Sequence, residues 1–216
     1  MNTKESGPST QPRGTVTGLH ERICVNPMYD DIAQELTDAH RNMERVLTLI
    51  RLQVDSLKEG QDPAGFLLLN NAISYMRDYP GVIHHPVEEL IFARLIQHAP
   101  ETRTVCSRLH DQHQNFRRRE ASLLRRIHSA QAGDLEACRQ VKQIGTAYCT
   151  EHASHIRSEE VDVFPQAVRW LENSDWREIG EQSRTLVDPL LVRKDLKQYD
   201  NLYDYLMTAG RDFNIH

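Results

Sequence analysis

Four histidines in this chain are each followed, four positions later, by a glutamate. Random placement of the chain's 11 histidines relative to its glutamates would give fewer than one such pair. On an α-helix, residues four apart lie on the same face, so each pair presents an imidazole nitrogen and a carboxylate together. Such a ligand set, with no thiolate, suits iron or manganese, and glutamates from two helices can bridge two cations. The pairs are His40 with Glu44, His84 with Glu88, His85 with Glu89, and His155 with Glu159.

The elements that position these pairs are predicted to be long helices, because apolar residues recur at intervals of three and four. We expect helices over about residues 28–59, 63–97, 101–131 and 135–171. Gly60 and Gly133 are natural stops, and Pro80 with Gly81 interrupts or kinks the second helix. Short turns between long helices imply antiparallel neighbours, and no segment shows a comparable strand pattern. The predicted fold is all-α, an antiparallel up-down-up-down four-helix bundle.

The predicted domain organisation has the bundle at residues 27–173 with a segment on each side. Residues 1–26 are polar and lack a hydrophobic period, which predicts a flexible N-terminal tail. Residues 174–216 carry further helical spacing around Trp176 and between Leu196 and Met207. We expect this segment to form a C-terminal helical extension packed on the bundle, because a separate domain of this length would be marginally stable.

Composition excludes several classes of protein. Hydrophobic residues make up 39% and charged residues 26% of the chain, as in an ordinary globular protein. No apolar stretch is long enough to span a membrane and the first residues lack the apolar core of a signal peptide, so we predict a cytoplasmic protein without a membrane partner. The net charge of −5 argues against a nucleic-acid partner. The four cysteines form no Cys-x-x-Cys pair, which excludes a zinc ribbon.

Every predicted helix carries at least one candidate ligand, because His113 lies on the apolar stripe of the third helix. Burying several imidazoles and carboxylates without a metal would cost several kcal/mol. These residues therefore either hold a metal or face water, and their convergence favours the metal. We expect Glu44 to be solvated or salt-bridged instead, and the arginine-rich run at 117–126 to be a solvated helix face.

The segments "HHPVEELIF" and "HIRSEEVDVFP", with "DAHRNME" and "DQHQNF", resemble the hemerythrin-like HHE cation-binding domain over about residues 30–172. The resemblance implies a non-haem di-iron site, two iron ions in a four-helix bundle, with manganese or zinc as alternative metals. Glu88 and Glu159 would be the bridges. Carried over by motif, the metal ligands are His40, His84, Glu88, His113, His155 and Glu159.

Two registers are open on the second helix. The spacing to the following phenylalanine favours His84 with Glu88 over His85 with Glu89, which leaves His85 beside the site or facing solvent. Tyr148, seven residues before His155, lies on the same helical face and is a candidate phenol near the site. The residues that we predict to orient ligands or to replace one of them are His85, Glu89, His110, Tyr148, His152 and Glu160.

The third helix departs from the oxygen-carrying hemerythrins, which supply two histidines spaced by four there. Leu109 and Arg117 stand four residues on either side of His113, which leaves a coordination position open unless His110 or Tyr148 fills it. The resemblance therefore implies a protein that binds or reacts with O2, peroxide or NO, in sensing or detoxification rather than oxygen transport. The alternatives are an iron storage, delivery or iron-sulfur repair module, and a metal-free helical interaction protein.

Overall fold

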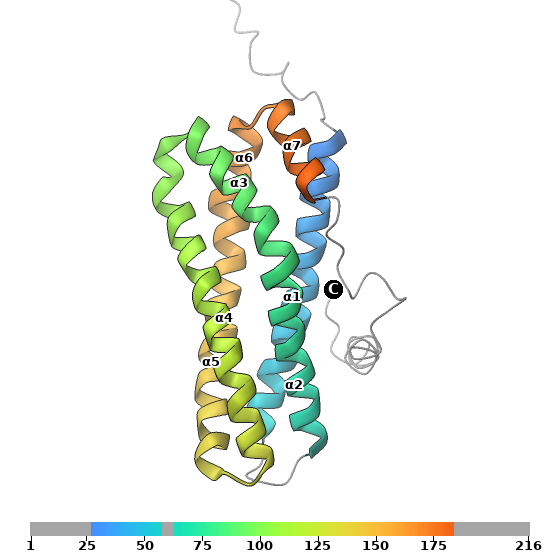
Figure 1. Ribbon diagram of the computed structural model, residues 1–216, viewed down its shortest axis with the longest axis vertical. Coiled ribbons are helices and arrows are strands. Elements are labelled where there is room, and N and C mark those ends of the chain that lie inside the picture. Colours follow the sequence, from blue (N-terminus) through green and yellow to red (C-terminus); the bar gives the residue numbers. More distant parts are fainter. Residues whose placement is uncertain (1–26, 58–62, 184–216) are drawn as a thin grey trace, which may run out of the picture.

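The computed structural model describes residues 27–57 and 63–183, and all regular elements in these ranges are helical (Figure 1). The predicted N-terminal tail and the predicted helix at 196–207 lie outside the described residues. The α-helices are α1 (Pro27–Ser56), α2 (Pro63–Asp78), α3 (His85–His98), α4 (Arg103–Gln131), α5 (Leu135–Ser158), α6 (Phe164–Trp170) and α7 (Asn173–Ser183). Two π-helical turns, η1 (Pro80–His84) and η3 (Glu159–Val163), and a 3-10 turn, η2 (Pro100–Thr102), complete the chain's described elements.

The helices form the predicted all-α four-helix bundle. α1 packs against α2 and α5, and α4 packs against the same two helices, so that the four rods enclose one core (Figure 1). α2, η1 and α3 together make the second rod, and α5, η3 and α6 make the fourth. α7 packs against α1 and α3 at one end of the bundle. No helix in the described ranges is long and apolar enough to cross a membrane.

The turn between α4 and α5 shows how local chemistry sets the antiparallel arrangement. Gly133 has a φ of 97°, a left-handed backbone conformation that residues other than glycine rarely adopt. Asp134 then caps α5, because its carboxylate accepts hydrogen bonds from the backbone N–H groups of Glu136 and Ala137 at 2.9 and 3.0 Å. The chain therefore reverses within a few residues, as the sequence predicts.

The sequence predicts that Pro80 and Gly81 interrupt or kink the second rod. In the structure the rod continues through them, and the helix widens there into the π-helical turn η1. The N–H of His84 bonds to the carbonyl of Tyr79, and that of His85 to Pro80, both five residues back. Proline lacks an N–H, and a π-helical turn is a common way to absorb such a defect, often at a functional site. Arg117 of α4 donates a hydrogen bond to the carbonyl of Gly81, which holds this turn against the third rod.

Two apolar clusters occupy the ends of the core, and a buried polar layer separates them along every rod. On α1, Ile32 and Leu36 belong to one cluster and Met43 and Val46 to the other. His40 stands between them, and the same alternation places the other polar residues of the layer. The layer is therefore enclosed above and below by packed hydrocarbon.

Candidate metal centre

All six predicted metal ligands lie together in this buried layer, and none is more than 2% exposed. Each rod of the bundle contributes, as helical periodicity predicts. The contributors are His40 of α1, His84 of η1, Glu88 of α3, His113 of α4, His155 of α5 and Glu159 of η3. Glu44, by contrast, is exposed on α1, in agreement with its interpretation as a solvated residue.

Glu88 lies between imidazoles from three rods. Its Oε1 atom is 2.9 Å from the Nε2 atom of His84 and 3.3 Å from that of His40. Its Oε2 atom faces the other way, 3.6 Å from the Nε2 atom of His113. One carboxylate thus reaches two separate groups of histidines.

Glu159 repeats this arrangement from the fourth rod. Its Oε2 atom lies 3.4 Å from the Nε2 atom of His40. Its Oε1 atom lies 2.9 Å from the Nε2 atom of His155 and 3.4 Å from that of His113. The two glutamates together connect a His40 and His84 group with a His113 and His155 group.

The outer nitrogens of these rings have partners of their own. His40 Nδ1 donates to Glu160 at 3.0 Å, and His113 Nδ1 donates to Glu89 at 2.8 Å. His155 Nδ1 donates to the side-chain oxygen of Gln112 at 3.0 Å. An acceptor at Nδ1 keeps the proton there and leaves the Nε2 lone pair directed inward, the arrangement found around metal-bound histidines.

The inward nitrogens of His113 and His155 are only 3.0 Å apart. With both Nδ1 atoms protonated, two lone pairs face one another, and they repel unless a proton or a cation lies between or beside them. Three further atoms of the layer, His84 Nε2, Glu88 Oε2 and Glu159 Oε1, are buried without a hydrogen bond among the described residues. Buried polar atoms are rarely left in this way, so the imidazoles and carboxylates present fit a cation.

Two sets of side chains place one ligand atom each within 4.8 Å of all the others in the set. One set holds His40, His84 and Glu88, and the other holds His85, Glu88, His113 and His155. A family model, the hemerythrin HHE cation-binding domain, matches residues 31–167. The chain belongs to the hemerythrin HHE family. No protein with a curated description matches the chain.

The electrostatics of this hemerythrin HHE domain favour positive charge in the layer. Burial would lower the pKa of His40, but hydrogen bonds to Glu159, Glu160 and Glu88 outweigh burial and raise that pKa well above its usual value. Burial would also lower the pKa of His113. The neighbouring carboxylates of Glu159, Glu89 and Glu88 outweigh burial and raise that pKa to about 9. Protons fill these positions when no cation is bound, and a metal ion would displace them.

The carboxylates respond in the opposite sense. Burial would raise the pKa of Glu88, but the electrostatic contact with His84 at 2.9 Å and the hydrogen bond from His40 hold this pKa well below its usual range. The pKa of Glu159 is also lowered, because His155 and His113 outweigh burial and the repulsion of Glu88. Both glutamates are therefore ionised and able to act as ligands.

His85 does not face solvent, which was one of its two expected positions. It is 3% exposed, and its ring stacks on that of His113 with centroids 3.9 Å apart. The π-helical turn before it explains the difference, because a wider turn brings the consecutive residues His84 and His85 both onto the inner side of the rod. The choice between the two registers is therefore not exclusive.

The other residues predicted around the site fall into two groups. Glu89 and Glu160 bind the outer nitrogens of ligand rings, and His110 joins them through a 2.9 Å hydrogen bond from its Nδ1 atom to Glu89. His152 and Tyr148 lie deeper along the bundle and are fully buried. The hydroxyl of Tyr148 donates to Glu120 at 2.8 Å and is directed away from the metal layer.

Sequence reasoning missed three residues of the site. Gln112 holds His155, Glu120 accepts from Tyr148, and the ring of Phe164 stacks on His40 with centroids 5.6 Å apart. Glu120 could have been found from the sequence, because it is a charged residue on the apolar face of α4. The partner of Gln112 lies 43 residues away, so no local pattern reveals that pair.

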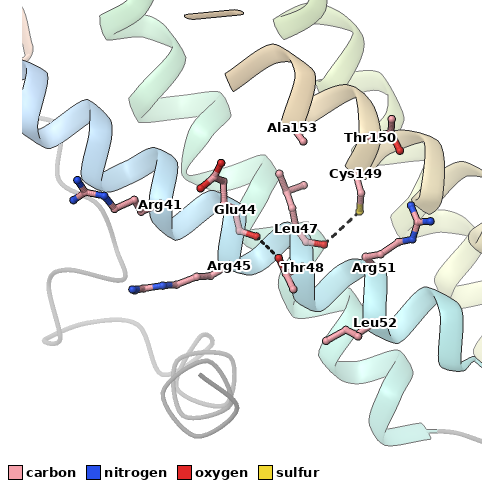
Figure 2. A pocket seen from close by; sticks show the side chains of 10 residues that line it. All are labelled: Arg41, Glu44, Arg45, Leu47, Thr48, Arg51, Leu52, Cys149, Thr150 and Ala153. Atoms are coloured by element: carbon pink, nitrogen blue, oxygen red, sulfur yellow. Dashed lines mark hydrogen bonds between the residues drawn. The ribbon is translucent and has the colours of Figure 1, made fainter. Parts of the chain in front are cut away.

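Two grooves lie on the surface of the hemerythrin HHE domain. The first, of about 550 Å³, runs between α1 and α5 and has Arg41, Arg45 and Arg51 around it and Cys149 at its floor (Figure 2). Burial raises the pKa of the Cys149 thiol to about 12, so this cysteine is a packing residue rather than a nucleophile. The second, of about 570 Å³, lies between α1 and α6 and includes Glu160 and Phe164. Of these two grooves, the second touches residues that contact a predicted ligand. A small cavity of about 40 Å³ elsewhere in the domain is lined in part by the predicted ligand His84 itself.

Proposed function

We propose that this protein binds two iron ions in the bundle core and reacts there with O2, peroxide or NO, in sensing or detoxification rather than oxygen transport. The observation that supports a dinuclear site is that Glu88 and Glu159 each contact both histidine groups. Carboxylates in such positions can bridge two cations and offset their charge. Manganese and zinc are the alternative metals.

The proposed ligands divide between the two ions by their positions. His40 and His84 would bind one ion, and His113 and His155 the other, with His85 beside the second group. Glu88 and Glu159 would bridge, as their distances to both groups support. The first ion then has fewer protein ligands than the second, which leaves room for a small exogenous molecule.

The chain's own residues prepare this chemistry. Glu160, Glu89 and Gln112 hold the imidazoles in the orientation that a metal needs. The apolar clusters on both sides of the layer exclude bulk water. Ferrous iron, when bound, would supply the electrons that reduce the oxidant. The near-complete burial of every proposed ligand favours a reactant of a few atoms over a bulky substrate.

The groove between α1 and α6 is the proposed approach for that reactant. Phe164 lines the groove and stacks on His40, and Glu160 lines it and hydrogen-bonds to the same ring. A small molecule in the groove would therefore lie against two side chains that contact the proposed ligand His40.

The first experiment measures the metal content and the ultraviolet-visible spectrum of protein purified from iron-supplemented culture. We expect about two irons per chain, with near-ultraviolet bands in air that bleach on reduction with dithionite. Stopped-flow mixing of the reduced protein with O2, peroxide or NO then identifies the reactant by an iron-dependent spectral change.

The matched variants are His155→Ala, which removes a proposed ligand, and His128→Ala, which removes an exposed histidine of α4. His155→Ala should lose iron, while His128→Ala should retain it. Iron that binds without any reaction would favour storage or delivery. Absence of metal from the wild-type protein would contradict the proposal and favour a helical interaction protein.

A further inference from the structure

A second buried polar group lies outside the metal layer, between α4 and α5. Tyr148 is fully buried, Glu120 and His152 are each 1% exposed, and the Tyr148 hydroxyl donates to Glu120 Oε1 at 2.8 Å. The surroundings are the apolar cluster that includes Phe116 and Leu123. Packing does not require these polar atoms, since a phenylalanine and a leucine would fill similar volumes without desolvation cost.

Glu120 is suited to take up a proton at neutral pH. Burial raises the pKa of its carboxyl to about 7, against the opposing effects of the Tyr148 hydrogen bond and of Arg77 and Arg117. Its second oxygen, Oε2, is buried without a hydrogen bond among the described residues. A proton transferred from Tyr148 would move along an existing hydrogen bond to an oxygen that exchanges protons in this pH range.

A continuous series of aromatic rings connects Tyr148 with the metal layer. The centroid of the Tyr148 ring is 4.7 Å from that of His152, and His152 is 6.1 Å from His155. Phe116 adds a parallel connection, 3.7 Å from His152 and 5.1 Å from His155. His155 directs its Nε2 atom at Glu159. Closely spaced aromatic rings provide short steps for electron transfer.

We propose that Tyr148 is a one-electron donor to the metal centre and that Glu120 accepts its proton. This inference rests on the proposed function. The O–H bond of Tyr148 breaks, its proton passes to Glu120, and its electron passes through the rings of His152 and His155. Peroxide needs two electrons and two protons to form two waters. When one iron is ferrous and the other is already ferric, the ferrous ion would supply one of these electrons and Tyr148 the other, so that both irons end ferric and Tyr148 becomes a neutral radical. Solvent supplies the two protons that the peroxide takes up.

The test is electron paramagnetic resonance of the full, iron-loaded chain, partly reduced with dithionite so that one iron is ferrous and the other ferric, and frozen shortly after mixing with hydrogen peroxide. We expect a free-radical signal with tyrosyl hyperfine structure, which narrows when the protein is grown with ring-deuterated tyrosine. Tyr148→Phe should reduce the signal to background. Tyr79→Phe is the matched control, because Tyr79 is another buried tyrosine whose ring lies 6.2 Å from that of a proposed ligand, His84; it should keep the signal.

Glu120→Gln tests the proton acceptor separately. In the wild-type protein the radical yield should rise with pH through about 7, as Glu120 becomes ionised. The glutamine variant retains a hydrogen-bond acceptor for Tyr148 but cannot take up the proton, so its yield should be low and independent of pH. A role in packing alone would not change the pH profile.

Iron content and near-ultraviolet bands, measured on the same samples, separate the two proposals. Wild-type protein without iron would defeat the proposed function and this inference with it. Wild-type protein that holds two irons but gives no tyrosyl signal would overturn the inference alone. A signal that persists in iron-loaded Tyr148→Phe, or disappears in Tyr79→Phe, would also overturn it.

Discussion

The imidazole rings of His85 and His113 stack face to face, with centroids 3.9 Å apart and planes inclined by 12°. His84, the neighbour of His85 in sequence, instead directs its Nε2 atom at the Oε1 atom of Glu88, the oxygen shared with His40. Two consecutive histidines therefore belong to opposite histidine groups. The two groups differ in their number of imidazoles. The group of His85 also contains His113 and His155, whereas the group of His84 contains only one other histidine, His40.

His84→Ala and His85→Ala should therefore have different effects on metal content. We expect His84→Ala to lose about one of two irons per chain, because a single imidazole is left on that side. We expect His85→Ala to keep both irons with lower affinity. Metal analysis after dialysis against a graded series of chelator concentrations checks this, with His128→Ala as control. Retention of both irons in His84→Ala together with loss of one in His85→Ala would assign the opposite register.

Glu89→Gln should lower metal affinity although Glu89 is not a proposed ligand. Glu89 accepts hydrogen bonds from His113 and His110, and its charge supports the basicity of the His113 ring. Loss of such an outer partner typically lowers metal affinity about 10- to 100-fold. Competition with a chelator of known affinity measures the change. Glu44→Gln, at an exposed position of α1, should leave affinity unaltered; an equal loss in both variants would point to overall charge instead.

Glu120 should make the stability of the metal-free protein depend on pH. Burial raises the pKa of its carboxyl to about 7, and the charged or titratable groups that act on it are Tyr148, Arg77, Arg117 and Asp78. A raised folded-state pKa means that the folded protein binds the proton more tightly than the unfolded chain. The resulting stabilisation is fully present at low pH and is lost as pH rises through about 7.

Glu120→Gln removes this titration. The difference in unfolding free energy, wild type minus variant, should be larger at pH 5 than at pH 8, by up to about 3 kcal/mol. Urea unfolding followed by circular dichroism, in the presence of chelator, measures it. Other titrating groups, including His40 and His113, are common to both proteins and cancel in the difference. Parallel stability curves for the two proteins would show that Glu120 does not titrate in this range.

Gly145→Ala should destabilise the bundle, although alanine favours a helix over glycine by about 1 kcal/mol. A Cβ atom at this position of α5 would lie 2.8 Å from Cγ2 of Val54 on α1. The valine side chain is stiff, so the helices would have to separate or the valine leave its rotamer, at about 1–3 kcal/mol. Urea unfolding should show a net loss of stability.

Val54→Ala in the Gly145→Ala background provides the control. Removing the valine methyl groups removes the clash, so the double variant should be more stable than the sum of the two single changes predicts. Additive losses would show that close packing of α1 on α5 at Gly145 does not limit stability.

Local patterns in the sequence predicted the four rods and the six residues that meet in the core. The interval of three and four between apolar residues fixes which face of each helix is buried. In two of the four His-x-x-x-Glu pairs, His84 with Glu88 and His155 with Glu159, both donors lie on that face. The short turn at Gly133 and Asp134 was predictable for the same reason, since capping depends on neighbouring residues only. The expected metals, reactants and cytoplasmic location remain predictions.

The tertiary structure alone decided how these faces meet. The π-helical turn at Pro80–His84 brings both His84 and His85 inward, which a regular helical period cannot represent. The pairs Gln112 with His155 and Glu120 with Tyr148 join residues of different helices, whose relative rotation and depth are set by packing over the whole core. The spacing of residues in the sequence determines the direction in which each side chain points from its own helix axis. The distance between two helix axes, which decides whether those side chains meet, depends on how the whole bundle packs.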